Sequence, residues 1–297
     1  MADRGMRILV TGATGFLGSR LVSHLARGHE IWAMIRSVPP PELAGVHWLR
    51  QDLAEDRWDV ALPSQIDAVI HLAQSPHFRN FPEAAREIYA VAAGATMRLL
   101  DWSVRAGARH FVLASTGGLY GSSDAALRET DALPEMRNQL GFYFAAKRAS
   151  ELLAIQYAGE INAIILRYFF VYGSGQAPQM LMPRLVANIR TGQPVYLHGE
   201  GGIRINPIHV DDAVESVQRC LELTESRLIN VAGPQVASLR DIALTIGRCV
   251  GRHPVFTVDA TVEPNHLVAD IRRMTSALGA PRFDIEAGIA ELCGSEP

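Results

Sequence analysis

The sequence predicts an α/β fold, in which a doubly wound parallel sheet is joined to a smaller C-terminal cap. Short β-rich runs alternate with longer segments whose apolar residues recur at helical spacing. The β-rich runs are apolar almost throughout, as is typical of strands buried on both faces of a parallel sheet. The alternation weakens after Gly173, where a linker-like stretch begins at Ser174. Together these observations favour a sheet covered by helices on both faces.

The first predicted element is a short β-rich run, Arg7–Val10, and a helix follows it at Phe16–Arg27. Within that helix Leu17, Leu21 and Leu25 recur every fourth residue and therefore share one face. The other strands of the sheet are expected at Glu30–Ile35, Val46–Leu49, Asp67–Leu72, Arg109–Ala114 and Asn162–Tyr168.

The remaining helices are predicted from the same spacing. A long helix is expected over Pro82–Ala106, which can begin at a proline because the first helical turn tolerates one. Another is expected over Gly141–Ala158. In the C-terminal third, four further helices are expected at Met180–Arg190, Asp211–Leu223, Leu239–Val250 and Asp270–Leu278.

Composition and charge limit the partners and the compartment. The 297 residues carry 28 Lys and Arg against 31 Asp and Glu, a net charge of −3, whereas nucleic-acid binders usually carry a basic excess. The apolar stretch Ile161–Tyr172 is interrupted by Asn162 and Arg167, so no membrane span is expected. The 3 cysteines are widely spaced and offer no metal or disulfide pattern. We therefore expect a cytoplasmic protein that binds neither nucleic acid, nor a membrane, nor a metal.

A glycine-rich turn follows the first strand. Gly12, Gly15 and Gly18 lie between that strand and the body of the first helix. In this context Gly12 permits a tight turn, Gly15 lets the backbone approach a pyrophosphate, and Gly18 allows the helix to pack closely on the strand. The amides at the start of the helix then face the phosphates. A dinucleotide site is the favoured prediction, and a purely structural turn is the alternative.

The second strand leads into Arg36, which bears on the choice of dinucleotide. A carboxylate here would bind the ribose 2′-hydroxyl of NAD, whereas an arginine favours the 2′-phosphate of NADP. Since neither Ile35 nor Arg36 is acidic, NADP is favoured over NAD. The alternative is a surface arginine that stacks on adenine and tolerates either cofactor. Asp52 is a candidate acceptor for the adenine amino group, or else an N-cap near Glu55.

A tyrosine, a lysine and a hydroxyl group form the candidate catalytic set. Tyr143 and Lys147 lie four residues apart on a predicted helix and share one face. An ammonium beside a phenol lowers the pKa of the phenol, which then exchanges protons nearer neutral pH. Thr116 follows a predicted strand and can place its hydroxyl at the same sheet edge. The alternative for Tyr143 is a core position, and His71 is expected to be a packed strand residue rather than a catalyst.

An ordered set of segments carries a family resemblance. The segments are Thr11–Gly18, Val69–Ala73, Ser115–Gly121, Tyr143–Lys147, Leu166–Gly173, Ile208–Ala213, Asn230–Gly233 and Ala269–Asp270. In this order they resemble the extended short-chain dehydrogenase/reductases of the NAD-dependent epimerase/dehydratase family, which act mainly on nucleotide sugars. The resemblance spans almost the whole chain and implies a Rossmann-like fold.

The resemblance implies a role for each matching position. Tyr143 would be the general acid/base, Thr116 would contact a substrate hydroxyl, and Lys147 would hold the ribose and tune Tyr143. Arg204 matches a position that often contacts the diphosphate of a nucleotide sugar, although a solvated loop arginine is the alternative. The residues expected around the dinucleotide are Gly12, Thr14, Gly15, Phe16, Leu17, Gly18, Arg36, Asp52, Leu53, Leu72, Ala73, Tyr143 and Lys147.

Departures from the family pattern narrow the function. Dehydratases of the family carry an acidic pair directly after the Thr116 position, where this chain has Gly117 and Gly118, so a 4,6-dehydratase is not expected. Phe170 stands where an asparagine usually helps to hold the substrate, and Ala92 or its neighbours stand at another such place. An apolar Phe170 would suit a bulkier or less polar substrate. The expected substrate contacts are Thr116, Gly117, Phe170 and Arg204.

Two classes of function follow. The first is an NAD(P)-dependent hydride-transferring enzyme that acts on a sugar, foremost a nucleotide sugar, by epimerisation or by reduction of a keto-sugar. An NADPH-dependent reductase of a non-nucleotide carbonyl compound is a variant of this class. The second is a non-catalytic dinucleotide sensor, which would not need Thr116, Tyr143 and Lys147 together.

The expected organisation is two domains. A dinucleotide-binding domain is predicted over residues 1–173 plus 203–233, and a substrate-binding domain over residues 174–202 plus 234–297. By resemblance, the helices around Pro82–Ala106 and Gly141–Ala158 would pair two copies into a homodimer.

Overall fold

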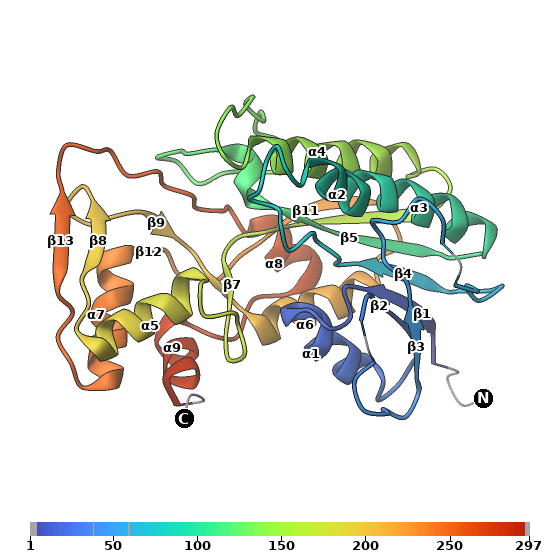
Figure 1. Ribbon diagram of the computed structural model, residues 1–297, viewed down its shortest axis with the longest axis horizontal. Coiled ribbons are helices and arrows are strands. Elements are labelled where there is room, and N and C mark those ends of the chain that lie inside the picture. The colour runs from blue at the N-terminus through green and yellow to red at the C-terminus, as the bar shows by residue number, and fades with distance from the viewer. Residues whose placement is uncertain (1–4, 38, 59, 295–297) are drawn as a thin grey trace. The chain divides into compact units, whose positions relative to one another are not determined.

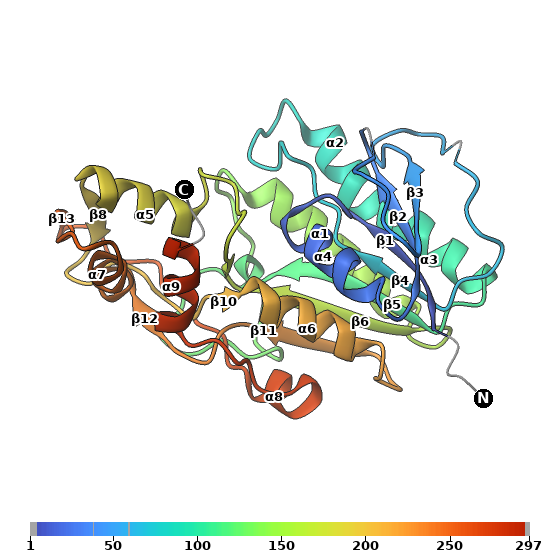
Figure 2. The same cartoon turned by 90° about the horizontal axis from the view of Figure 1, so that it is seen from below.

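The computed structural model describes residues 5–37, 39–58 and 60–294. A seven-stranded sheet lies in the part of the chain for which a dinucleotide-binding domain is predicted (Figures 1 and 2). Its strands are β1 (Arg7–Thr11), β2 (Glu30–Ile35), β3 (Val46–Arg50), β4 (Ala68–His71), β5 (His110–Thr116), β6 (Asn162–Tyr168) and β11 (Arg227–Val231). The order is β11-β6-β5-β4-β1-β2-β3, and the registers that join β3, β2, β1, β4 and β5 are parallel. The predicted doubly wound parallel sheet is confirmed.

The order of the strands reverses between β1 and β4. The chain builds outward from β1 to β3 on one side and from β4 to β6 on the other. In open sheets of this kind, ligands bind beyond the carboxyl ends of the strands at such a reversal. The glycine turn after β1 and the segment after β4 lie at this place.

Helices cover both faces of the sheet. They are α1 (Phe16–Leu25), α2 (Ala85–Tyr89), α3 (Ala95–Arg105) and α4 (Gly141–Gln156). Figure 1 shows α2, α3 and α4 along one face and α1 along the other. The helices bury the apolar faces that the spacing predicts, such as Leu21 and Leu25 on α1 and Leu99 and Leu100 on α3.

The long helix predicted over Pro82–Ala106 consists of three segments. Residues 81–84 form a turn, so the helix begins at Ala85 rather than at Pro82. Between α2 and α3 a π-helical turn, η1, covers Ala90–Gly94. Apolar spacing does not reveal such a turn, because the buried side chains on either side of it keep facing the sheet. Single π turns within helices are frequent at functional sites.

The chain divides into two compact units. Within the described ranges, the first unit comprises residues up to Leu119 together with Pro134–Arg167 and Val217–Ile229. The second comprises Tyr120–Leu133, Tyr168–Ser216 and the chain from Asn230 onward. Residues 1–4 and 295–297 of the predicted domains lie outside the described residues. The functional division into dinucleotide and substrate domains stays a prediction.

The second unit has its own apolar core, to which Val186, Ile242, Ile246 and Ile289 contribute. Its helices and strands are mostly short, and the sequence reading missed its strands and the last helix. The missed strands form the pairs β7 (Val171–Tyr172) with β10 (Ile208–His209), β9 (Arg204–Ile205) with β12 (Ala237–Ser238), and β8 (Val195–His198) with β13 (Phe256–Asp259). The helices are α5 (Leu181–Thr191), α7 (Leu239–Val250), α8 (Arg272–Leu278) and α9 (Ile285–Gly294). Helix α6 (Val210–Cys220) is divided between the two units after Ser216.

The described residues also bear on membrane and metal binding. None of the helices in those ranges is both long and apolar enough to cross a membrane. Likewise, no group of three or more His, Cys, Asp and Glu side chains in those ranges could hold a metal ion.

Candidate active site

The glycine turn requires glycine at two of its three positions. Gly12 has a φ of 68°, a left-handed conformation that side chains rarely adopt. A Cβ on Gly12 would lie 2.8 Å from the backbone nitrogen of Ala73, and one on Gly18 would lie 2.1 Å from the carbonyl oxygen of Gly12. Gly15 is the N-cap of α1 and offers no side chain to the first amides. Those amides are therefore available to an anion, as a pyrophosphate site requires.

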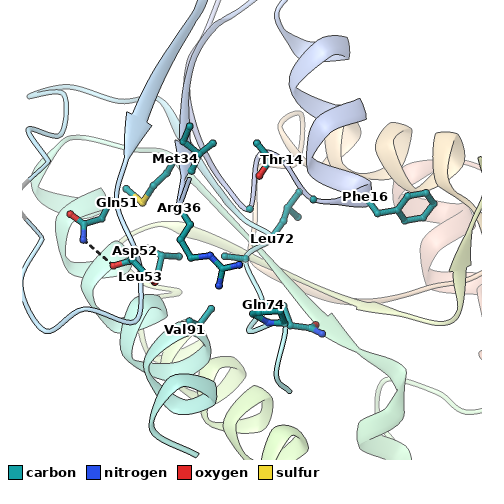
Figure 3. Close-up of a pocket in the computed structure, with 15 residues that line it drawn as sticks. Thr14, Phe16, Met34, Arg36, Gln51, Asp52, Leu53, Leu72, Gln74 and Val91 are labelled. Carbon is teal, nitrogen blue, oxygen red and sulfur yellow. Dashed lines mark hydrogen bonds between the residues drawn. The ribbon is translucent and has the colours of Figure 1, made fainter. Parts of the chain in front are cut away.

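A cavity of about 510 Å³ opens beside this turn, within the first unit (Figure 3). Most of the residues expected around a dinucleotide line it. Leu17 and Gly18 do not, because they belong to the body of α1, where Gly18 is buried beneath the turn. Tyr143 and Lys147, on α4, are not among the lining residues either. The lining residues are Gly12, Thr14, Gly15, Phe16, Met34, Ile35, Arg36, Gln51, Asp52, Leu53, Leu72, Ala73, Gln74, Pro76 and Val91. The glycine cradle and the cavity together fit an extended dinucleotide.

Arg36 supplies the positive charge of this cavity. Figure 3 shows its guanidinium extending from the end of β2 into the space between Leu53 and Leu72. The carboxylate of Asp52 is engaged locally, because its Oδ1 accepts a hydrogen bond from the Ala54 amide at 2.9 Å. This bond closes a local turn and does not cap a helix as the N-cap alternative expected, because residues 53–57 form turns and bends; Asp52 still lines the cavity. The cavity thus contains a cation at the end of β2, where NAD-specific sites carry an acid.

Tyr143 and Lys147 lie one turn apart on α4 and are both buried. The Tyr143 hydroxyl donates a hydrogen bond to Oε1 of Gln74 at 2.9 Å, and it is also hydrogen-bonded to the Thr116 hydroxyl. The Lys147 ammonium donates to the carbonyl oxygen of Ala114 at 2.9 Å. The structure therefore brings all three predicted catalytic residues to the carboxyl end of β5.

Gln74 is a site residue that the sequence reading missed. It lines the cavity and also accepts the hydrogen bond of the Tyr143 hydroxyl, so it connects the two groups of residues. Its position in the sequence could have predicted it as a site residue, since it directly follows Ala73 at the end of the fourth strand. Polar residues at the carboxyl ends of parallel strands are candidate site residues on that ground alone.

The expected lowering of the Tyr143 pKa is wrong for this structure. Burial raises the pKa of Tyr143 well above its ordinary value, and the hydrogen bond to Thr116 opposes the rise only in part. The ring packs between Phe78 and Phe144 at centroid distances of 5.1 and 5.4 Å. Lys147 does not counteract this effect, since its ammonium is directed to the Ala114 carbonyl. The phenol is therefore held in its protonated form.

His71 is a packed strand residue, as expected. Its Nδ1 lies 2.6 Å from the Thr11 hydroxyl, and the same hydroxyl oxygen accepts the Ala73 amide at 3.3 Å. Burial, assisted by the positive charge of Lys147, lowers the pKa of His71 to about 3. The neutral ring therefore ties β1 to the end of β4, directly beneath the glycine turn.

This buried histidine predicts acid-sensitive stability. The folded-state pKa of about 3 lies below the ordinary value of 6.5, so the unfolded chain binds the extra proton first. The free energy of unfolding should then fall by about 1.4 kcal/mol per pH unit as the pH drops from 6.5 toward 3. Urea titrations at several pH values should show that His71→Asn removes this component of the slope. The matched change His253→Asn, at an exposed position, should keep it, and an unaltered slope in His71→Asn would contradict the assignment.

The second of the two glycines after Thr116, Gly118, sits in a tight space. A Cβ on Gly118 would lie 2.5 Å from Cε1 and 2.7 Å from Cζ of the Phe144 ring. The Gly118 amide donates to the Thr116 hydroxyl at 3.1 Å, which fixes the turn. Gly117 begins the 3₁₀ turn η2 (Gly117–Tyr120). A side chain at position 118 would require the Phe144 ring to move.

The other predicted substrate residues belong to the second unit. Phe170 has a φ of 48°, a left-handed conformation that is unusual for a bulky residue. Arg204 is exposed on β9, and its Nη2 donates to the carbonyl oxygen of Asp124 at 3.2 Å. Ala92, at the place of a family asparagine, is buried in η1 of the first unit.

Comparison with known proteins identifies the family. The model of the NAD dependent epimerase/dehydratase family matches residues 8–232. The chain belongs to this family. The resemblance carried by the glycine turn and the Tyr143–Lys147 pair is thereby confirmed.

Three relatives indicate the range of the family near this chain. A dTDP-4-dehydro-6-deoxy-D-allose reductase of Streptomyces sp is 30% identical, with 98% of this chain and 96% of the relative covered. A dTDP-glucose 4,6-dehydratase of Streptomyces antibioticus is 30% identical, with 96% of this chain and 90% of the relative covered. The solved structure of MoeE5 in complex with UDP-glucuronic acid and NAD is 29% identical, covers 97% of this chain and 98% of its own, and has a TM-score of 0.80. Since a dehydratase is among them, the expectation against dehydration stays a prediction.

Proposed function

We propose that the protein reduces a keto-sugar carried on a nucleoside diphosphate, with NADPH as the reductant. The observation that carries this proposal is the position of Tyr143, a buried and protonated phenol hydrogen-bonded to Thr116 and to Gln74 at the edge of the cavity. A carbonyl that accepts hydride also needs a proton, and a protonated phenol is the form that donates one. The reductase relative, which is similar over nearly the whole chain, supports the same direction of reaction.

Each residue has a role in this reaction. The dinucleotide, when bound, would supply the hydride that the carbonyl carbon accepts. The Tyr143 hydroxyl gives its proton to the carbonyl oxygen, and the Thr116 hydroxyl donates a hydrogen bond to the same oxygen. The Lys147 ammonium holds the nicotinamide ribose, and the turn from Gly12 to Gly18 receives the pyrophosphate. The first unit is thus the dinucleotide unit, and the second carries the sugar-nucleotide contacts Phe170 and Arg204.

The choice of NADPH rests on Arg36. Its guanidinium extends into the cavity from the end of β2, and a guanidinium pairs with a 2′-phosphate through two parallel hydrogen bonds. No carboxylate follows β2 directly to repel that phosphate, since the next residue is Ser37.

Dehydration is disfavoured by the space around Gly118. An acid at that position, as the family pattern of dehydratases requires, would begin 2.5 Å from the Phe144 ring. Gly117 and Gly118 carry no group that could move a proton. The reaction therefore ends with the transfer of hydride and proton.

Epimerisation is the second candidate, and one observation favours it. MoeE5, which is similar to this chain over nearly its full length, has been solved with UDP-glucuronic acid or UDP-glucose together with NAD. An epimerase oxidises and then reduces the same sugar carbon, so it retains its dinucleotide through the cycle. Mass spectrometry of the dinucleotide that co-purifies tests the choice. Retained NAD would favour the epimerase, and a site that takes up added NADPH would favour the reductase.

The activity itself is tested by offering keto-sugars of different kinds. A dTDP-4-keto-6-deoxyhexose should be reduced with consumption of NADPH, and the product should carry a new hydroxyl group. If only carbonyl compounds without a nucleotide were reduced, the substrate would not be a nucleotide sugar, because the nucleotide would play no part in binding. Binding of NADPH without turnover of any carbonyl compound would instead indicate a dinucleotide sensor.

The proposed assembly is a homodimer that pairs the faces of α2–α3 and α4. Tyr89, Met97, Leu152 and Ile155 are exposed on these helices with exposed fractions of 46% to 58%. Large apolar side chains grouped in this way are typical of interaction surfaces.

Leu152→Glu should convert the dimer to a monomer, because a carboxylate buried in an apolar interface costs several kcal/mol. Light scattering after size-exclusion chromatography measures the mass. Val255→Glu, at an exposed position in the second unit, is the control and should leave the mass unchanged. Equal masses for wild type and Leu152→Glu would refute this interface.

A further inference from the structure

A buried carboxylate lies one turn beyond Lys147 on α4. Glu151 accepts two hydrogen bonds from Arg167, one from Nε at 2.9 Å and one from Nη2 at 2.6 Å. It also accepts a hydrogen bond from the hydroxyl of Ser115 at 2.5 Å. All three side chains are at most 6% exposed. We call these three residues the carboxylate clamp.

The clamp joins the two elements that carry the candidate catalytic residues, β5 and α4, to the neighbouring strand β6. Ser115 directly precedes Thr116 on β5, Glu151 shares α4 with Tyr143 and Lys147, and Arg167 lies on β6. None of the three clamp residues takes a direct part in the proposed reaction. Burying an ion pair is costly, and a hydrophobic pair of similar volume is often as stable, so stability alone is weak grounds for it.

We infer that Glu151 is a positioning residue for the reaction: held by Ser115 and Arg167, its carboxylate keeps the buried Lys147 ammonium charged and seated on the Ala114 carbonyl. This inference rests on the proposed function, in which the charged ammonium holds the ribose of the dinucleotide. It adds to that function a residue, Glu151, that stabilises the charged form of Lys147. Arg167 opposes this effect, because it pairs with the same carboxylate.

The electrostatic surroundings of Lys147 support this role. Burial lowers the pKa of Lys147 to about 8, and Glu151 acts in the opposite direction. The other titratable or charged groups that face it are Tyr143 on its own helix, His71 on β4 and, through Glu151, Arg167 on β6. His71 and Tyr143 are both neutral, since burial lowers the pKa of the first and raises that of the second. Glu151 is therefore the one negative charge that the described surroundings of Lys147 supply.

Substitutions of Glu151 and of Arg167 should shift the pH at which Lys147 loses its proton in opposite directions. Glu151→Gln keeps the shape and the hydrogen-bonding capacity but removes the charge, so the pH above which Lys147 loses its proton should fall by about one unit or more. Arg167→Met frees the carboxylate from its guanidinium, which leaves Lys147 as its partner, so that pH should rise. If the clamp had only a structural role, the two substitutions would not shift this pH in opposite directions.

The experiment measures the dissociation constant of NADPH by fluorescence from neutral to alkaline pH in the full-length protein. Wild type should bind more weakly as the pH rises past about 8, where Lys147 loses its proton. This alkaline limb should shift down in Glu151→Gln, shift up in Arg167→Met, and vanish in Lys147→Met. Glu160→Gln is the matched control, because it makes the same chemical change at an exposed position just beyond α4.

Three outcomes separate the claims. If Lys147→Met keeps the wild-type limb, the role of Lys147 in the proposed function fails, and the inference fails with it. If Lys147→Met removes the limb but the two clamp variants shift it in the same direction or not at all, the inference alone is overturned. Should a single variant not fold, the double change Glu151→Gln with Arg167→Met removes both charges of the clamp together. It should still shift the limb down, because Lys147 then lacks the Glu151 charge; an unshifted limb would overturn the inference.

Discussion

Tyr143→Phe should reduce turnover by about 10²–10⁴-fold and leave dinucleotide binding nearly unchanged. The substitution removes one oxygen atom and keeps the ring that packs between Phe78 and Phe144. The lost hydroxyl is the group that hydrogen-bonds Gln74 and Thr116 and that donates the proton in the proposed reaction. Steady-state rates with a nucleotide keto-sugar and NADPH titration of the same preparation measure the two effects.

The control for this variant is Tyr157→Phe, which removes a phenolic hydroxyl at the C-terminal end of the same helix. Its turnover should match that of wild type. Undiminished turnover in Tyr143→Phe would exclude the tyrosine as the acid. A parallel loss of NADPH affinity would instead place its role in binding.

Arg36→Asp should weaken the binding of NADPH by about 10²-fold or more and that of NADH far less. A hydrogen bond to a charged group contributes about 1.5–3 kcal/mol, and the new carboxylate adds repulsion toward a 2′-phosphate. NADH carries a hydroxyl in that position, which a carboxylate can accept. Dissociation constants for both reduced dinucleotides, measured by fluorescence at one ionic strength, give the ratio.

Arg27→Asp makes the same change of charge at an exposed position at the end of α1, away from the cavity lining. It should leave the ratio of the two dissociation constants unaltered. An equal loss for NADPH and NADH in Arg36→Asp would show that Arg36 stacks on the adenine and does not read the 2′-phosphate.

The sheet could be predicted from the sequence because its strands are short apolar runs separated by helices of regular spacing. Glu30–Ile35 and Asn162–Tyr168 were predicted with the bounds that the structure has. The π turn at Ala90–Gly94 could not be predicted, since it leaves the apolar pattern in phase. The two-residue strands of the second unit, such as Arg204–Ile205, are too short for any alternation to be seen.

The candidate site was predictable to the extent that its residues stand within local patterns. The glycine turn, Arg36 and the Tyr143–Lys147 pair each belong to such a pattern, and most of the expected dinucleotide residues line one cavity. Residues whose partners are distant in sequence were missed. Gln74 reaches Tyr143 across 69 residues, and the clamp joins positions 16 and 36 residues apart. The spacing of residues within one segment does not predict contacts between residues so far apart in the sequence.

The direction of the Tyr143 pKa shows the same limit. A tyrosine and a lysine on one helical face suggest mutual influence, yet the sequence does not specify how deeply the phenol is buried or where the ammonium is directed. In the structure the ammonium binds the Ala114 carbonyl, and burial determines the charge of the phenol. The phenol is therefore protonated at neutral pH, as an ordinary phenol also is, and the reduction proposed for this site uses it in that form.

The proposed function requires this site to move a hydride between a dinucleotide and a nucleotide sugar, with Tyr143 as the acid. The most direct test mixes NADPH-loaded wild-type protein with a dTDP-4-keto-6-deoxyhexose and follows the absorbance of the reduced nicotinamide through a single turnover. The absorbance should be lost in wild type, with one hydroxyl sugar formed for each NADPH consumed, and should be retained in Tyr143→Phe. An absorbance that stays constant in wild type while the sugar nucleotide binds would contradict the proposed function.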